Sequence, residues 1–507
     1  MSHIIVVGYG MVGSRFVEDL TAADRDGDHL VTVLGDEACE PYNRVLLSDV
    51  VAGSRGLSTI GLPAADHPRV TVRRGTPVRS IDRGRRDVVL ADDSRIPYDH
   101  LVLATGATAR VPALPGIDEG DLPGGVHVLR SIDDAREIVA ATLNARRAIV
   151  LGGGVLGLEA ATGLAGRDLA VTVVHPGPAL MERQLDEDAS RVVESTLRRT
   201  GVDQRVGVGA QEVVVEDGRL SRVRLTNGEV LAADLLVIST GTIANTSLAA
   251  DAGIAVERGV LVDADLTTSD VHVHAIGDCA QPPGGSSGLV AQGWEHARRL
   301  ADLLTGTDPV SVATGAGDVV KPKTRGVDIV TMGIGGSTRT TDPALRVMRL
   351  TDPSAGRHLE IVVRDGLLVG ATAIGAGRIG TDLVTSYTRR TPLPADPAHL
   401  LLPAIAPSAA STRQDSPMLV PDRATICRCN GVTKADIRAE FRSGATSLED
   451  VAERTKATTG CGGCTDAVCG ILDWLTQDSR SQVEPTPREE RFTPEKHDAD
   501  RPETRAS

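Results

Sequence analysis

Residues 8–13 read Gly8-Tyr9-Gly10-Met11-Val12-Gly13, and this stretch decides the fold of the N-terminal part of the chain. The β-branched run over residues 4–7 precedes it, and an apolar helical pattern over residues 16–20 follows. A Gly-x-Gly-x-x-Gly turn between a strand and a helix is the dinucleotide-binding fingerprint. We expect Gly8 to make the tight turn, Gly10 to let backbone amides approach a pyrophosphate, and Gly13 to let the helix pack on the strand. Met11 and Val12 are expected to line the same site.

An acidic residue after the next strand strengthens this interpretation. A second strand is predicted over residues 30–34, and Glu37 follows it. At this place a carboxylate accepts a hydrogen bond from a ribose hydroxyl. A glycine-rich turn alone is weak support, but a strand, a helix and an acid in the required order predict a dinucleotide site.

The same pattern recurs in the middle of the chain. A strand over residues 147–151 leads into Gly152-Gly153-Gly154-Val155-Leu156-Gly157, and another strand follows over residues 170–174. We expect Gly152, Gly154, Val155, Leu156 and Gly157 to hold a second dinucleotide. Two fingerprints in one chain are typical of a flavin reductase, in which one site holds FAD and the other receives NADH or NADPH.

Two further strands end in residues suited to the first cofactor. The apolar strand over residues 102–104 ends in Thr105-Gly106, where we expect the chain to pass from the first nucleotide-binding domain to the second. The strand over residues 273–276 ends in Gly277-Asp278, which would place a carboxylate beside the flavin ribityl chain or pyrophosphate. Each is an ordinary strand followed by a turn when taken alone, and their order after the fingerprints favours the functional interpretation.

The cysteines gather near the C-terminus in two close pairs. Cys427-Arg428-Cys429 and Cys461-Gly462-Gly463-Cys464 contain four of the seven cysteines. Thiolates at such spacing bind zinc or an iron–sulfur cluster. The one-residue gap between Cys427 and Cys429 favours iron and sulfide, and a flavin site upstream needs a one-electron acceptor. A zinc-stabilised small domain is the alternative.

Composition limits the class of protein. The chain has 507 residues, a formal charge of −14 and 41% hydrophobic residues. This length predicts several domains, and the negative charge argues against nucleic acid or an anionic membrane as the main partner. We find no signal peptide and no apolar run long enough to span a membrane. The odd number of cysteines in paired spacing predicts a reducing compartment, so we expect a cytoplasmic protein.

These motifs together resemble the flavoproteins with two dinucleotide-binding domains. The chain is most similar to the N-terminal half of the large subunit of assimilatory NAD(P)H nitrite reductase, and to the electron-transfer subunit of assimilatory nitrate reductase. The most specific matching stretches are Tyr42-Asn43-Arg44-Val45-Leu46-Leu47-Ser48 and Cys461-Gly462-Gly463-Cys464. The likeness covers roughly residues 3–475.

The resemblance implies an α/β fold class: two Rossmann-type domains as in glutathione-reductase-like flavoproteins, a small α/β interface domain and a small helical, ferredoxin-like [2Fe–2S] domain. Residues 401–423 are rich in Pro, Ala and Ser, as in a linker, and the charged tail lacks apolar residues, as in disordered segments. The expected boundaries are 1–115 with 243–309 for the FAD-binding domain, 116–242 for the NAD(P)H-binding domain, 310–400 for the interface domain, 401–423 for the linker, 424–476 for the [2Fe–2S] domain and 477–507 for a disordered tail.

The resemblance also implies roles for single residues. Glu159 is expected to approach the nicotinamide as a catalytic residue, with an ordinary surface acid as the alternative. Asn43 and Arg44 are expected at FAD, where Arg44 touches a phosphate or fixes the flavin loop; a surface ion pair is its alternative. Cys427, Cys429, Cys461 and Cys464 would hold the [2Fe–2S] cluster. A small interface domain of this kind often forms a homodimer face.

Two positions depart from the family pattern. His175 stands where NADH-preferring relatives carry an acid that binds the ribose diol. NADPH is therefore not excluded, and we favour NADH only slightly. The stretch of residues 239–245 contains Gly241, which we expect at the nucleotide, but it lacks the arginine that usually follows Thr-Gly-x.

The function expected from all this is electron transfer from NAD(P)H through FAD and the cluster to a separate nitrate or nitrite reductase subunit. Cys39, Cys279 and Cys469 are too few to hold the additional four-cysteine cluster of a sirohaem reductase. One alternative is a similar reductase that serves a ferredoxin or an oxygenase. The others are a redox sensor and a flavin disulfide reductase with a structural zinc domain.

Overall fold

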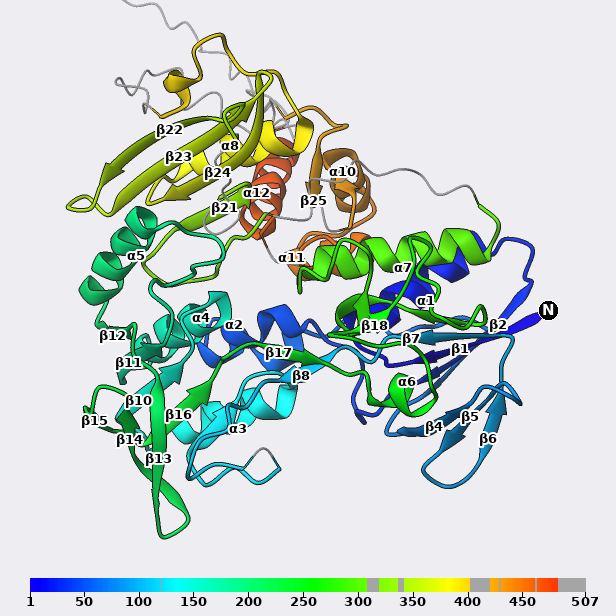
Figure 1. The fold of residues 1–507 in the computed structure, drawn as a ribbon. Helices are drawn as coiled ribbons and strands as arrows, with labels where there is room; N and C mark the ends of the chain where they lie inside the picture. Colours follow the sequence, from blue (N-terminus) through cyan, green and yellow to red (C-terminus); the bar gives the residue numbers. More distant parts are fainter. Residues whose placement is uncertain are drawn as a thin grey trace, which may run out of the picture.

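The first fingerprint follows the central strand of a five-stranded parallel sheet with the order β19-β7-β1-β2-β3 (Figure 1). The structure, a computed structural model, describes residues 1–118, 120–307, 319–335, 342–401, 420–427, 430–460 and 463–481. The strands of this first sheet are β1 (Ser2–Val7), β2 (His29–Leu34), β3 (Val70–Arg73), β7 (His100–Leu103) and β19 (Val273–Ala275). β1, β7, β19 and most of β2 are buried because both faces of this part of the sheet are covered, whereas the edge strand β3 alternates half-buried and exposed residues.

Two helices cover one face of the first sheet and a small antiparallel sheet covers the other (Figure 1). The helices are α1 (Met11–Ala23) and α7 (Val290–Leu304), and the small sheet contains β4 (Val78–Asp82), β5 (Asp87–Leu90) and β6 (Arg95–Pro97). Phe16, Val17 and Leu20 of α1 are buried at helical spacing against the strands. The fingerprint turn is therefore held between a buried strand and a buried helix.

The second sheet repeats this layout with the order β12-β11-β10-β16-β9, again with parallel neighbours. Its strands are β9 (Val126–Val128), β10 (Arg147–Leu151), β11 (Ala170–His175), β12 (Val202–Val206) and β16 (Leu235–Ile238). On one face lie α2 (Leu47–Val51), α3 (Ile132–Thr142), α4 (Val155–Ala165) and α5 (Glu187–Arg199). On the other lie β13 (Ala210–Glu216), β14 (Arg219–Leu225) and β15 (Val230–Ala232). The predicted pair of Rossmann-type folds is confirmed.

Two short strands carry the chain between the two sheets. β8 (Ala107–Ala109) pairs antiparallel with β17 (Thr242–Ala244), so the chain crosses over and back at the same place. Shorter elements are η1 (Arg44–Leu46), η2 (Leu57–Thr59), α6 (Ser247–Asp251), β18 (Val260–Leu261), η3 (Gly277–Cys279), β20 (Ala280–Gln281) and η5 (Pro397–Leu401).

A small antiparallel sheet with the order β21-β24-β23-β22 packs beside α5. It contains β21 (Ile329–Gly333), β22 (Arg346–Asp352), β23 (Arg357–Arg364) and β24 (Leu367–Ile374), with α8 (Arg378–Arg389) against it. These elements lie within residues 310–400, where the sequence predicts a small α/β domain. Most of the predicted linker, residues 402–419, lies outside the described residues.

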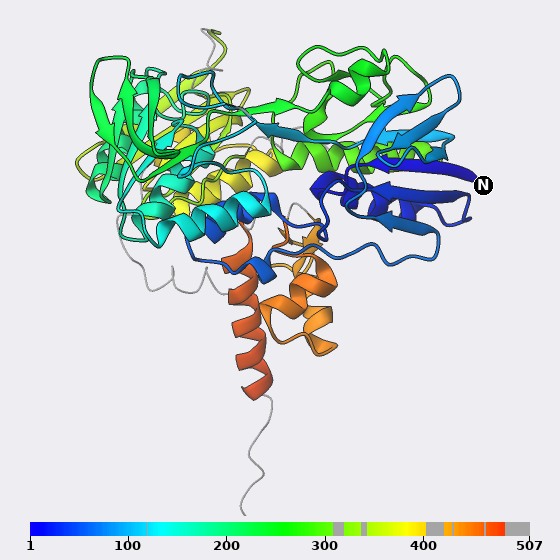
Figure 2. The ribbon, with the colours of Figure 1, turned by 90° about the horizontal axis from the view of Figure 1, so that it is seen from below.

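The C-terminal cysteine domain runs from β25 to α12 and projects from the nucleotide-binding domains (Figure 2). It contains β25 (Thr425–Cys427), β26 (Val432–Thr433), α10 (Lys434–Arg442), α11 (Leu448–Thr455) and α12 (Thr465–Ser481). Capping boxes at Thr433 and Ser447 begin α10 and α11. The prediction of a disordered tail from residue 477 is wrong for its first residues, because α12 continues to Ser481; residues 482–507 lie outside the described part.

Candidate cofactor sites and cysteine centre

The first fingerprint has the geometry that a pyrophosphate site requires. Gly8 has φ +110°, and a Cβ there would lie 2.2 Å from the carbonyl oxygen of Ala104. A Cβ at Gly13 would lie 2.0 Å from the carbonyl oxygen of Gly8, so only glycine allows this approach of helix and strand. Gly10 is the N-cap of α1. Because no side chain accepts a hydrogen bond from the first amides of this helix at the cap, these amides are available to an anion.

The second fingerprint repeats this geometry. Gly152 has φ +115°, and a Cβ there would lie 2.1 Å from the carbonyl oxygen of Ser239. A Cβ at Gly157 would lie 2.0 Å from Gly152 O, whereas at Gly154 it would meet nothing within 4 Å. Val155 and Leu156 begin α4 beside this open N-terminus. Both turns therefore fit a dinucleotide phosphate.

Charged side chains line the approach to the first fingerprint. Glu37 pairs with Arg44 and accepts a hydrogen bond from Tyr42 Oη at 2.8 Å. Arg44 Nη1 donates to the carbonyl oxygen of Arg130 at 3.1 Å, and Arg130 Nη2 pairs with Asp278 at 2.8 Å. The structure thus connects the acid after β2 with the carboxylate after β19. Arg130 was missed from the sequence, where nothing marks it among the other arginines.

Thr105, Gly106 and Gly277 also lie at this site. Thr105 Oγ1 donates to Asn245 O at 2.9 Å, and Asn245 Nδ2 donates to Thr105 O at 2.8 Å. A Cβ at Gly106 would approach Arg130 Nη2 to 4.0 Å, and one at Gly277 would contact the side chain of Val12 at 3.1 Å. The fingerprint is therefore flanked by the ends of β7 and β19, as expected. Met11 contributes its carbonyl oxygen, which accepts from Trp294 Nε1 at 3.3 Å.

At the second fingerprint, His175 is held between the turn and an acid that sequence reasoning missed. Its Nδ1 accepts from the amide of Gly153 at 3.2 Å, and its Nε2 lies 3.1 Å from Glu182 Oε2. Glu182 thus brings a carboxylate to the end of β11, although no acid ends the strand itself. Gly241, at φ +106°, follows β16, and its carbonyl oxygen accepts from the amide of Arg110 at 2.9 Å.

A buried ion pair lies where the two nucleotide-binding domains meet. Glu159, on α4 just after the second fingerprint, is 5% exposed. Both its carboxylate oxygens contact Lys323 Nζ, at 2.9 and 3.0 Å, and Ser48 Oγ donates to Oε2 at 2.5 Å. Burial raises the pKa of neighbouring Asp49. The positive charge of Lys323 acts to lower this pKa, and the negative charge of Glu159 acts to raise it. Lys323 lies 164 residues further along the chain, so no local sequence pattern indicates this contact.

The cysteine pairs are described in part. Cys427 is 1% exposed at the end of β25, and Asn430 Nδ2 donates to its Sγ at 3.8 Å. Cys464 is half-buried just before α12. Cys429 and Cys461 lie outside the described residues. An amide donor beside a thiolate sulfur and the two close pairs in the sequence fit an iron–sulfur centre.

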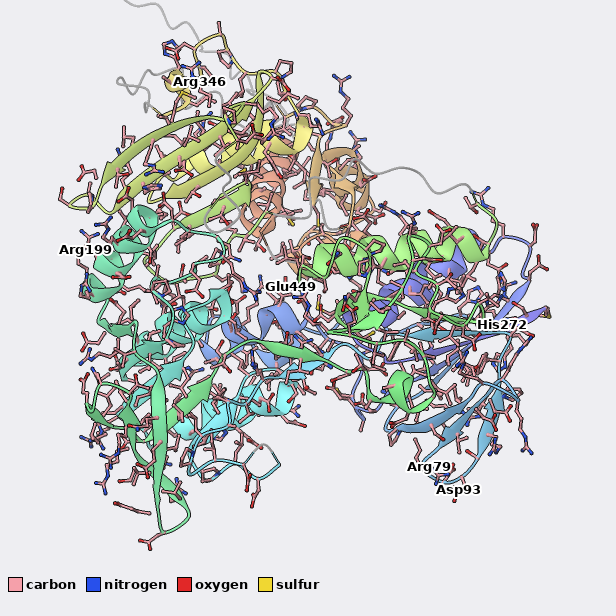
Figure 3. All side chains as sticks on the ribbon, viewed as in Figure 1. Arg79, Asp93, Arg199, His272, Arg346 and Glu449 are labelled. Atoms are coloured by element: carbon pink, nitrogen blue, oxygen red, sulfur yellow. The ribbon has the colours of Figure 1, made fainter. Side chains whose placement is uncertain are left out.

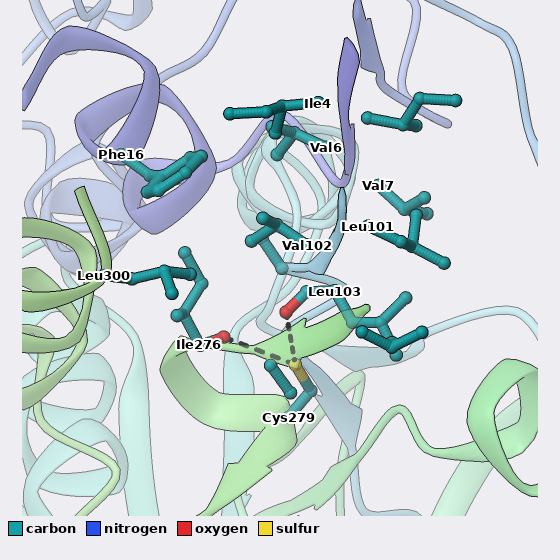
Figure 4. Packing of buried hydrophobic residues seen from close by; sticks show 14 of the residues in the cluster. Ile4, Val6, Val7, Phe16, Leu101, Val102, Leu103, Ile276, Cys279 and Leu300 are labelled. Carbon is teal, nitrogen blue, oxygen red and sulfur yellow. Dashed lines mark hydrogen bonds between the residues drawn. The ribbon is translucent and has the colours of Figure 1, made fainter. Parts of the chain in front are cut away.

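The other cysteines have packing roles. Cys279 is fully buried in the first core and donates to the carbonyl oxygens of Leu103 and Ile276, both at 3.3 Å (Figure 4). Burial raises the pKa of its thiol. Burial and Glu37 likewise raise the pKa of Cys39, so neither thiol has the low pKa of a redox nucleophile. Cys469 is half-buried on α12.

One further cluster of titratable groups joins α5 to the small sheet. Asp186, His358 and Glu360 place ligand-type atoms within 4.8 Å of one another. Arg349, however, already lies 3.0 Å from Asp186 Oδ2 and 2.8 Å from Glu360 Oε2. The guanidinium balances both carboxylates, so we interpret the cluster as an ionic clamp between the domains.

Two family models match this chain. The family model of the pyridine nucleotide-disulphide oxidoreductases matches residues 2–301, and that of the BFD-like [2Fe-2S] binding domain matches residues 425–474. None of the helices in the described part of the chain is long and apolar enough to cross a membrane.

Two curated relatives come from Bacillus subtilis. The chain is 32% identical to a nitrite reductase [NAD(P)H] over 93% of its own length and 57% of the relative's. It is 30% identical to an assimilatory nitrate reductase electron transfer subunit over 96% of its own length and 61% of the relative's. It therefore spans little more than half of each.

Among solved structures, the covalent putidaredoxin reductase–putidaredoxin complex matches with a TM-score of 0.70 and 24% identity. The match covers 79% of this chain and 95% of that chain, and at this identity it supports the fold alone. With the family matches, the repeated fingerprints and the cysteine domain taken together, the chain belongs to the pyridine nucleotide-disulphide oxidoreductase family, as an NAD(P)H oxidoreductase whose cofactors are FAD and, in its BFD-like domain, a [2Fe–2S] cluster.

Proposed function

We propose that this chain takes electrons from NAD(P)H and passes them through FAD and the [2Fe–2S] cluster to a separate nitrate or nitrite reductase subunit. The observation that carries the proposal is the position of the cysteine domain. It lies against the first nucleotide-binding domain, where Asn43 Nδ2 donates to the carbonyl oxygen of Thr459 at 2.5 Å. When bound, FAD accepts a hydride from the nicotinamide and releases its two electrons singly, as a cluster requires.

The first fingerprint is proposed to hold FAD. Gly8, Gly10 and Gly13 would bring the amides of α1 to the pyrophosphate, with Met11 and Val12 in the same turn. Glu37 would accept from the ribose, and Arg44 would neutralise phosphate charge. The remaining proposed contacts are Thr105, Gly106, Gly277, Asp278 and the additional residue Arg130.

The second fingerprint is proposed to hold NAD(P)H through Gly152, Gly154, Val155, Leu156, Gly157, His175 and Gly241. We propose NADH as the preferred form. The carboxylate of Glu182, held 3.1 Å from His175 Nε2, would repel a 2′-phosphate. Glu159 is proposed to approach the nicotinamide, with Lys323 and Ser48 fixing its position.

The cluster is proposed to be held by Cys427, Cys429, Cys461 and Cys464. The electron acceptor is proposed from the names of the relatives, because nitrite and nitrate reductases match nearly the whole chain. We also propose the domain boundaries given from the sequence, with the cysteine domain extended to residue 481. The reduced thiols that a cluster needs favour the cytoplasm. We propose β22, the edge strand of the small sheet among the described residues, as a candidate homodimer face.

Reconstitution tests the acceptor. Purified chain, NADH and a nitrate reductase catalytic subunit are mixed anaerobically with nitrate, and nitrite is measured; the same is done with a nitrite reductase catalytic module and nitrite. Turnover with one of them that exceeds turnover with a ferredoxin supports the proposal. Turnover with ferredoxin alone would contradict it and favour a reductase for another acceptor.

A further inference from the structure

The contacts between the cysteine domain and the first nucleotide-binding domain come mostly from residues close to the cysteines in the sequence. Apart from Lys456, these residues are Asn430, which follows Cys429, Thr459 and Gly460, which precede Cys461, and Thr465, which follows Cys464. These described neighbours of the cysteines therefore lie on the edge of the domain that faces the nucleotide-binding domain, and we call this edge the cysteine edge.

On the other side, the contacts come from the FAD fingerprint helix and the loop after β2. Arg15 Nη1 donates to Asn430 Oδ1 at 2.8 Å, and Glu18, one helical turn further along α1, pairs with Lys456. Asn43 Nδ2 donates to the carbonyl oxygens of Thr459 and Gly460. Arg55 Nη2 makes a longer contact of 3.4 Å with Thr465 Oγ1.

Asn43 connects the surroundings of the first proposed cofactor site to the cysteine domain. It is 1% exposed, and its Oδ1 accepts from the amide of Val45, which fixes the side chain. Its chain neighbour Arg44 contacts Glu37 at the first site. Gly460, which Asn43 contacts, directly precedes Cys461 in the sequence. Asn43 therefore links a residue beside the first fingerprint to a residue beside a cluster ligand.

These contacts are polar, and the ion pair between Lys456 and Glu18 is reached by water. Among the described residues, the buried apolar core of the cysteine domain is separate from that of the first nucleotide-binding domain. Lys456 and Glu18 have side chains 28% and 40% exposed. A cavity of about 260 Å³ opens between α1 and the cysteine domain and is lined by Arg15, Glu18 and Lys456. Permanent interfaces are usually larger and more apolar.

We infer that these residues form a reversible, salt-sensitive docking interface, which holds the cysteine edge against the FAD-binding domain for electron transfer. It consists of Arg15, Glu18, Asn43 and Arg55 on one side and Asn430, Lys456, Thr459, Gly460 and Thr465 on the other. The inference rests on the proposed function, since it names the contact through which one electron at a time would leave the first cofactor. The cysteine domain docks to receive electrons and separates to expose its cysteine edge to an acceptor.

Charge reversal of Glu18 tests this interface in the full chain. Glu18→Lys replaces an attraction to Lys456 with a repulsion, and Glu18→Lys/Lys456→Glu restores the attraction with the signs exchanged. Glu295→Lys is the matched control, because Glu295 is exposed on neighbouring α7 and makes none of these contacts. The radius of gyration is measured by small-angle X-ray scattering at low salt and at about 0.5 M salt.

We expect Glu18→Lys to increase the radius of gyration at low salt, the double variant to restore it, and Glu295→Lys to leave it unchanged. Salt at about 0.5 M should enlarge the wild type in the same way. In rapid mixing with NADH, flavin bleaching should keep its rate in Glu18→Lys. The later loss of cluster absorbance should slow roughly threefold to tenfold, as the change at one exposed ion pair allows.

Two results would overturn the docking inference: an unchanged radius of gyration in Glu18→Lys at both salt concentrations, or wild-type cluster reduction in a variant whose cysteine domain has separated. A wild-type protein that binds a cluster but never reduces it with NADH would instead overturn the proposed function. The two failures are therefore distinguishable.

Discussion

Replacing Lys323 with methionine is expected to destabilise the junction of the two nucleotide-binding domains. Lys323 Nζ lies 2.9 and 3.0 Å from the carboxylate oxygens of Glu159, whose side chain is 6% exposed. At this separation and an effective dielectric constant of about 20, the attraction is about 5 kcal/mol. Breaking a buried pair costs roughly 3–5 kcal/mol. Because Ser48 and the backbone amide of Lys323 still donate to Glu159, we expect a loss of about 2–3 kcal/mol.

Scanning calorimetry at neutral pH measures this loss as a lower melting temperature, by roughly 5–10 °C for a domain of this size. Lys321→Met is the matched control in the same segment, since Lys321 is exposed, and it should change the melting temperature by only about 1 °C. Glu159→Gln/Lys323→Met should lose less than Lys323→Met alone, because no unpaired charge stays buried. Equal melting of Lys323→Met and Lys321→Met would refute the reasoning.

Three other predictions follow from the described contacts. Arg349→Met removes the guanidinium that lies 2.8 Å from the buried carboxylate of Glu360 (side chain 2% exposed) and should lower the unfolding free energy by about 2–4 kcal/mol. Arg346→Met, at an exposed ion pair on the outer side of the small sheet (Figure 3), should lower the unfolding free energy by less than about 0.5 kcal/mol. Equal losses of unfolding free energy for the two variants in urea would contradict the ionic clamp around Arg349. Glu182→Gln should raise the ratio of kcat/KM for NADPH to that for NADH about tenfold, equivalent to ~1.4 kcal/mol, and an unchanged ratio would show that Glu182 does not face the 2′ position. Burial lowers the pKa of His296 to about 4, below the ~6.5 of the unfolded chain. The unfolded state therefore takes up the proton first as pH falls from 6.5 to 4, and stability should fall by up to ~1.4 kcal/mol per pH unit; a His296→Gln variant with the same pH slope of melting temperature would disprove this.

The parts of the fold that were predicted correctly are those that depend on local sequence patterns. The turns at Gly8 and Gly152 need a positive φ and close approach to a carbonyl group, and each requirement falls on a residue within the fingerprint itself. The strands before and after each fingerprint follow from β-branched runs that parallel sheets bury on both faces. The order of the motifs then determined the domain order.

Residues that reach a site from a distant part of the chain were not predictable. Arg130 and Lys323 meet Asp278 and Glu159 only after the domains pack. Glu182 is only seven residues from His175, but it reaches the imidazole because the turn after β11 folds back, and no local pattern indicates that turn. The docking role of Asn43 depends on the cysteine domain, more than four hundred residues later in the chain. The end of α12 was misplaced because charged residues after 476 suggested a tail, whereas Ile471, Leu472 and Leu475 anchor a helix that continues further.

An anaerobic titration of the purified protein with NADH, followed by visible absorption, tests the proposed electron route from NADH through FAD to the cluster. We expect the flavin absorbance to bleach, the broad cluster absorbance then to fall, and each chain to take up more than two electrons in total. Flavin bleaching without any cluster absorbance, or a cluster that stays oxidised beside fully reduced flavin, would contradict it.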